Sequence, residues 1–115
     1  MSNDELKALG KRVYEAINAR DLATLEELFD PRIIRHASDE VGISNAMEAV
    51  KSTFAASPDI RFEVEDLIAD TDKVALRVTV HRGDPAVDTS PPTILEIFRV
   101  ADGRVAEIWG AGTGG

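Results

Sequence analysis

Hydrophobic positions in the first half of the chain recur with a helical period. Between residues 3 and 19 they fall three or four positions apart, at Leu6, Leu9, Val13 and Ile17, so one face of this segment is apolar. Similar spacing covers residues 21–29 and 44–56, where Asp21 and Ser44 can act as N-caps. The pattern predicts three helices, and the short β-branched segment 32–37 is typical of a strand.

In the second half of the chain, hydrophobic residues alternate with polar ones, which is the pattern of β-strands. Strands are predicted over residues 60–65, 74–80, 93–100 and 104–109. Asp102-Gly103, between the last two, favours a two-residue hairpin turn. Helices followed by an antiparallel meander predict an α+β domain with its helices on one face of a curved sheet.

Composition narrows the possible functions. A chain of 115 residues is expected to form a single domain, residues 1–115. Its 21 acidic residues outnumber 13 Lys and Arg, for a formal charge of -8, which disfavours nucleic acid as a partner. The absence of Cys excludes a thiolate nucleophile and Cys-based metal sites. Without a long apolar run or a signal-peptide pattern, we expect a cytoplasmic protein that does not bind a membrane.

The last predicted hairpin carries ionisable residues among apolar ones. With Asp102-Gly103 as the turn, strict pairing sets Glu96 opposite Trp109 and makes Glu96 and Glu107 diagonal neighbours. If both were buried, each carboxyl group could raise the pKa of the other, as acid–base chemistry uses; two solvated glutamates are the alternative. Arg99 falls on the opposite face, where its guanidinium either holds a substrate oxygen or pairs with a structural acid.

Both faces of this hairpin are largely apolar, although an antiparallel sheet with one solvated face needs only one apolar side. We therefore expect one face to pack on the helices and the other to form a homodimer through the sheet. A pocket for a small apolar or aromatic ligand is expected, with lining residues Tyr14, Ile34, Phe54, Leu95, Ile97 and Trp109.

His36 is the histidine best placed to act as an acid or base, because it shares a strand face with Ile34. A structural histidine is the alternative. The two histidines, His36 and His81, lack the spacing of a metal site, so no metal is expected. Residues 110–115 match the Gly-x-Gly-x-x-Gly pattern, but no helix follows to bind a pyrophosphate. We expect a flexible tail there and no cofactor.

Several segments, taken in order, carry a resemblance to a known family. They are residues 21–30, His36, and residues 57–66, 72–77 and 97–109. Together they resemble the SnoaL-like polyketide cyclases of the nuclear-transport-factor-2-like superfamily. The resemblance implies a cone-shaped fold, in which three helices pack on a strongly bent, mainly antiparallel sheet and enclose an apolar pocket.

The resemblance also implies a range of activities. Family members close a ring by intramolecular aldol condensation without a cofactor, and relatives of the same fold isomerise ketosteroids, open epoxides or dehydrate small molecules. Cyclases of this kind are expected to use a histidine and an acid, and the acid follows the tryptophan of the last strand. Here that region is residues 110–115, which contain no acid.

Two hypotheses about function follow. The first is a cofactor-independent enzyme, such as a cyclase or isomerase, that acts on an apolar carbonyl substrate. In it His36 serves as acid or base, Arg99 as the oxyanion partner, and Glu107 or Glu96 as the acid. The second is a non-catalytic, dimeric ligand-binding or accessory domain. Ionisable groups that converge in a buried pocket would favour the enzyme.

Overall fold

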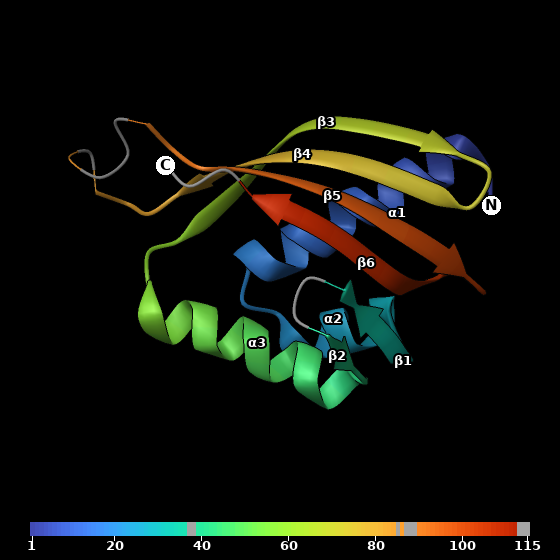
Figure 1. The fold of residues 1–115 in the computed structure, drawn as a ribbon, viewed down its shortest axis with the longest axis horizontal. Coiled ribbons are helices and arrows are strands. Elements are labelled where there is room, and N and C mark those ends of the chain that lie inside the picture. Colours follow the sequence, from blue (N-terminus) through green and yellow to red (C-terminus); the bar gives the residue numbers. More distant parts are fainter. Residues whose placement is uncertain (37–38, 85, 87–89, 113–115) are drawn as a thin grey trace.

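In the computed structural model, three helices cover the concave face of a six-stranded sheet (Figure 1). The structure describes residues 1–36, 39–84, 86 and 90–112. Within these residues the elements are α1 (Asn3–Asn18), α2 (Leu22–Leu28), β1 (Phe29–Arg35), β2 (Glu40–Val41), α3 (Ile43–Ala56), β3 (Arg61–Asp70), β4 (Lys73–His81), β5 (Thr93–Ala101) and β6 (Arg104–Gly112). The α+β class predicted from the sequence is confirmed.

The three predicted helices are confirmed to within two residues. Helix α1 begins with a capping box, in which the Ser2 side chain accepts from the Glu5 backbone and the Glu5 side chain accepts from the Ser2 backbone. Asp21 caps α2, as predicted. Ser44 does not cap α3; Gly42 occupies that position with φ +100°, a conformation that costs glycine little and lets the chain turn directly from β2 into the helix.

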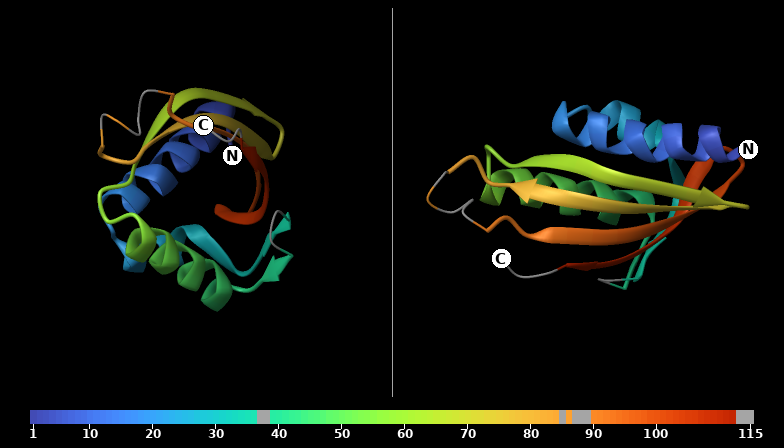
Figure 2. Two further views of the ribbon diagram at one scale, coloured as in Figure 1. Left: turned by 60° about the vertical axis from the view of Figure 1, so that its left-hand side comes forward. Right: turned by 90° about the horizontal axis from the view of Figure 1, so that it is seen from above.

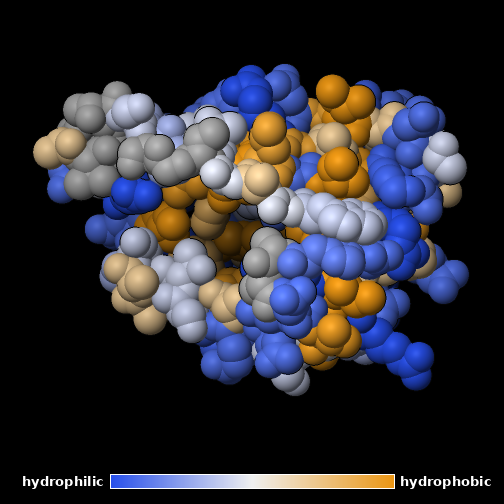
Figure 3. All heavy atoms as spheres, in the orientation of Figure 1, coloured by the Kyte–Doolittle hydropathy of each residue, from blue (hydrophilic) through white to orange (hydrophobic). Residues whose placement is uncertain are grey.

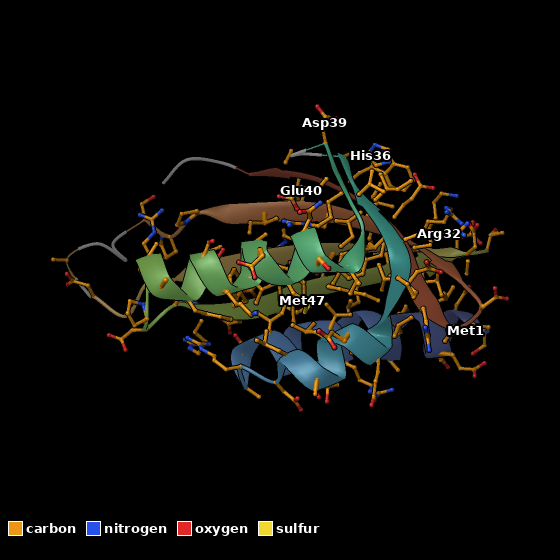
Figure 4. All side chains as sticks on the ribbon, turned by 90° about the horizontal axis from the view of Figure 1, so that it is seen from below. Met1, Arg32, His36, Asp39, Glu40 and Met47 are labelled. Carbon is orange, nitrogen blue, oxygen red and sulfur yellow. The ribbon has the colours of Figure 1, made fainter. Side chains whose placement is uncertain are left out.

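The sheet has the order β2-β1-β6-β5-β4-β3 and is strongly bent but not closed (Figure 2). All neighbouring pairs are antiparallel except β1 and β6, which are parallel. Helices α1 and α3 lie on the concave side. Met47 reaches from α3 into the core (Figure 4), whose most deeply buried side chains are Leu6, Val13, Leu25, Ile33, Val74, Val78, Phe98 and Val105.

The β5–β6 hairpin turns at Asp102-Gly103, as predicted; both residues have positive φ, at +53° and +77°, which suits the two central positions of a type I′ turn. The predicted pairing is wrong beyond the first residues. Val100 pairs with Val105, but Arg99 pairs with Glu107, so β6 contains one extra residue. Such a bulge moves every later side chain to the other face.

The bulge changes which residues share a face of the sheet. Glu96 lies opposite Gly110 instead of Trp109, and Trp109 pairs with Ile97. Glu96 therefore faces the helices, whereas Glu107 and Trp109 face outward, and the predicted diagonal contact between the two glutamates does not exist.

The end of β6 differs from the expected flexible tail, because residues 110–112 pair with β5 as a regular strand. Residues 113–115 lie outside the described part of the chain.

Among the described helices, none is long and apolar enough to cross a membrane.

Candidate functional site

A cavity of about 300 Å³ lies between the concave face of the sheet and helices α1 and α3. Its wall is mainly apolar and includes Val13, Ile17, Val50, Phe54, Phe62, Phe98 and Ile108. Figure 3 shows an opening edged by hydrophobic residues between α3 and the sheet. A volume near 300 Å³ is at the lower end of the range for small-molecule sites.

A tyrosine and a glutamate meet inside this cavity. Tyr14 comes from α1 and is 6% exposed; its hydroxyl donates a hydrogen bond to Oε1 of Glu96 on β5. The Tyr14 ring is held by Phe62 and Phe98, with ring centroids 5.7 Å and 6.5 Å away. Gly110 lies opposite Glu96, and a Cβ there would be in ordinary van der Waals contact with the Cγ atom of Glu96, at 3.4 Å.

The cavity alters the acidity of both groups. Burial raises the pKa of Glu96 above its ordinary value, although the Tyr14 hydrogen bond and the charge of Arg35 act in the opposite direction. Burial and the neighbouring Glu96 raise the pKa of Tyr14 well above its usual value. The tyrosine therefore keeps its proton, while the glutamate can exchange one nearer to neutral pH than a solvated carboxyl group.

Arg35 is the only basic side chain among the described residues that line the cavity. It stands at the end of β1, and its Nη1 atom donates to Oε2 of Glu40 at 2.6 Å. In Figure 4, Glu40 lies on the α3 side of the β1–β2 connection, whereas Asp39 points away from the molecule. Arg35 thus brings a positive charge to a mainly apolar cavity, within reach of the Tyr14–Glu96 pair.

These groups suit proton transfer. An acid whose pKa is raised by burial, next to a hydroxyl that stays protonated, can take a proton from a substrate while the hydroxyl donates a hydrogen bond. Among the residues that the structure describes, no group of three His, Asp or Glu side chains lies where it could hold a metal ion.

A second cluster of ionisable side chains lies on the outer face of the sheet. Glu107 accepts from Nε of Arg99 at 2.6 Å, and its other oxygen lies 2.8 Å from Nε2 of His36. The His36 ring stacks on Trp109 with a centroid separation of 4.8 Å and an interplanar angle of 6°. The hydrogen bonds from His36 and Arg99 lower the pKa of Glu107. We call these four residues the outer cluster.

The predicted site residues are thus divided between two faces of the sheet. Tyr14, Phe54 and Glu96 line the cavity. Leu95, Ile97 and Trp109 line a shallow outer groove of about 550 Å³, and Glu96 also borders this groove. His36, Arg99 and Glu107 come together as expected of one site, but they do so in the outer cluster.

Ile34 belongs to neither lining, because it pairs with Glu107 and so faces outward. Arg35 was missed by the sequence analysis. Strand alternation was the available signal: with Ile34 and His36 on one face of the predicted strand 32–37, Arg35 must face the other.

The comparisons with known proteins agree with this architecture. Residues 11–108 match the SnoaL-like domain family. The chain belongs to the SnoaL-like domain family. No curated protein matches the sequence.

Several solved structures are similar to this chain. IdmH from Streptomyces antibioticus, provisionally named a polyketide cyclase, is 28% identical with a TM-score of 0.75, over 91% of this chain and 89% of that one. AclR from Streptomyces galilaeus, provisionally named a hydroxylase, is 29% identical with a TM-score of 0.78, over 97% and 81%. A protein of Kribbella flavida, provisionally named a ketosteroid isomerase, shares the fold at 18% identity, with a TM-score of 0.81 over 97% and 80%.

Proposed function

We propose that this SnoaL-like domain is a cofactor-independent acid–base enzyme that acts on a small, apolar carbonyl compound. The observation that carries the proposal is the hydrogen-bonded pair of Tyr14 and Glu96 inside an apolar cavity. Glu96 is the proton-transfer group and Tyr14 the hydrogen-bond donor. Residues 110–115, which follow the last tryptophan, contain no acid, and in this proposal Glu96 supplies the carboxyl group from the neighbouring strand.

The reaction begins with the ionised form of Glu96. Its carboxylate removes a proton from the carbon next to the carbonyl group, so that a C–H bond breaks and an O–H bond forms on Glu96. The electron pair moves onto the carbonyl oxygen, to which the Tyr14 hydroxyl turns its single proton from Glu96 as the carboxylate takes up the substrate proton. The high pKa of Tyr14 keeps this donor protonated.

Two outcomes are open to the resulting enolate. Return of the proton from Glu96 to a different carbon completes an isomerisation. Attack of the enolate carbon on a second carbonyl group, with the Glu96 proton passing to the new alkoxide, completes a ring closure. The names of the Kribbella flavida protein and of IdmH correspond to these two reactions, and both use the same first step.

Solvent exchange at carbon tests that first step without knowledge of the natural substrate. The probe is 1-tetralone in deuterium oxide, and NMR follows the loss of the protons next to its carbonyl group. We expect catalysed exchange by the wild type and a loss of about 10² to 10⁴ in rate for Glu96→Gln. Glu107→Gln, an equivalent change on the outer face, serves as the matched control and leaves the rate unchanged.

The opposite result would favour the second hypothesis. If the wild type binds 1-tetralone but exchanges its protons no faster than Glu96→Gln does, the domain is a ligand-binding protein and the acid–base proposal fails.

We also propose that the chain forms a homodimer through the outer face of the sheet. Ile68, Leu95 and Ile97 are 68%, 55% and 42% exposed there, and apolar surface of this kind favours an interface. Sedimentation at tens of micromolar checks this, and Ile97→Lys should shift any dimer toward monomer.

A further inference from the structure

The geometry points to a ligand with an anionic group, held by Arg35 at one end of the cavity while its carbonyl group lies at Glu96. This inference rests on the proposed function for the identity of the reacting end. It adds a substrate class: a compact apolar keto acid, whose carboxylate is separated from the carbonyl by the body of the molecule.

Arg35 has hydrogen-bonding capacity that its protein partner does not use. A guanidinium carries five N–H donors in a planar fork. In the part of the chain that the structure describes, Glu40 accepts one hydrogen bond from Arg35, through Nη1. The Arg35 side chain is 31% exposed and lines the cavity, so further donors are available to a ligand carboxylate.

The rest of the cavity makes this choice selective. Its wall is aliphatic and aromatic, and its other ionisable groups, Tyr14 and Glu96, already share a hydrogen bond. A carboxylate placed beside Glu96 would be repelled, whereas one beside Arg35 forms charge-assisted hydrogen bonds. The net charge of -8 disfavours anions in general, so any preference for an anion must come from this local cation.

Sheet register sets the separation between the two ends of the ligand. Arg35 pairs with Ile108, Ile108 pairs with Phe98, and Glu96 is two residues from Phe98 along β5. On a flat sheet this puts the Cα atoms of Arg35 and Glu96 about 12 Å apart. Because the sheet is strongly bent and both side chains face its concave side, their polar groups lie closer together than this, which limits the body of the ligand to one or two rings.

A matched pair of ligands tests the inference. The probes are 1-tetralone-6-carboxylate and its methyl ester, and calorimetry measures the affinity of each. We expect the wild type to bind the carboxylate at least about tenfold more tightly, the usual worth of one hydrogen bond to a charged group. Arg35→Gln should bind the two probes equally. Arg77→Gln, which removes an outer-face arginine paired with Asp66, should keep the wild-type preference.

Other results of this experiment would contradict either the inference or the proposed function. Equal binding by the wild type, no binding of the carboxylate, or a preference that survives Arg35→Gln would overturn the inference. If Arg35→Gln does not fold, Arg35→Met replaces it, since methionine keeps an apolar stem of similar length without the charge; an undiminished preference there also overturns it. Glu96→Gln separates the two proposals: it should lose proton exchange and retain the preference. A preference without exchange in the wild type would leave Arg35 as a binding residue and refute only the acid–base function.

Discussion

Each face of the β5–β6 hairpin carries a glutamate, and the two surroundings shift the pKa of these glutamates in opposite directions. On the concave face, burial raises the pKa of Glu96. On the outer face, His36 and Arg99 lower the pKa of Glu107 by hydrogen bonding to it. A carboxylate fixed by two donors has little tendency to take up another proton, whereas a buried one exchanges it more readily. The better-connected cluster is therefore the less suitable acid–base site.

The largest expected effect is a difference in stability loss between substitutions on the two faces, because only the concave face is closely packed. Phe98 is 1% exposed and contacts the cavity, whereas the adjacent Ile97 is 42% exposed on the outer face. Phe98→Ala should lower the free energy of unfolding by about 3–5 kcal/mol. At protein concentrations low enough to keep the chain monomeric, Ile97→Ala should change it by about 0.5 kcal/mol or less. Urea denaturation of both variants measures the contrast.

A larger loss for Ile97→Ala at higher protein concentrations would mean that the proposed dimer buries the outer face. Repeating the measurement at several protein concentrations distinguishes this case, because the stability of a dimer depends on concentration.

A smaller effect should appear in how stability depends on pH. The raised pKa of Glu96 means that the folded state favours its protonated form, so its contribution is complete below the unfolded pKa and is lost as pH rises through the folded value. The lowered pKa of Glu107 has the opposite sign: its contribution exists above the unfolded pKa and is lost as pH falls through the folded value.

Denaturation from about pH 3 to about pH 8 can resolve the two contributions. Glu96→Gln should remove a decline of stability on the neutral side of the profile, and Glu107→Gln should remove one on the acid side. If both substitutions flatten the same side, the carboxyl groups share one environment and the contrast between the faces is lost.

Local signals explain how much of this architecture was predictable. Helical periodicity and the Asp21 cap located the helices, and Asp102-Gly103 located the turn, because each depends on neighbouring residues. The bulge near Ala106 has no such signal, and one inserted residue reverses the facing of everything after it. The contact between Tyr14 and Glu96 joins residues 82 positions apart, so it depends on the finished fold.

The smallest effect concerns His36, whose ring lies on the outer face, 41% exposed at its side chain. An exposed polar contact of this kind contributes little to stability, so His36→Ala should lower the thermal midpoint only slightly. It should leave the exchange of 1-tetralone protons unchanged, because His36 does not line the cavity. Since His36 stacks on Trp109, the one tryptophan of the sequence, tryptophan fluorescence should change and show that the contact has been removed. A tenfold fall in exchange with an unaltered midpoint would instead return His36 to the acid–base role that its sequence position suggests, and the division between the two faces would no longer hold.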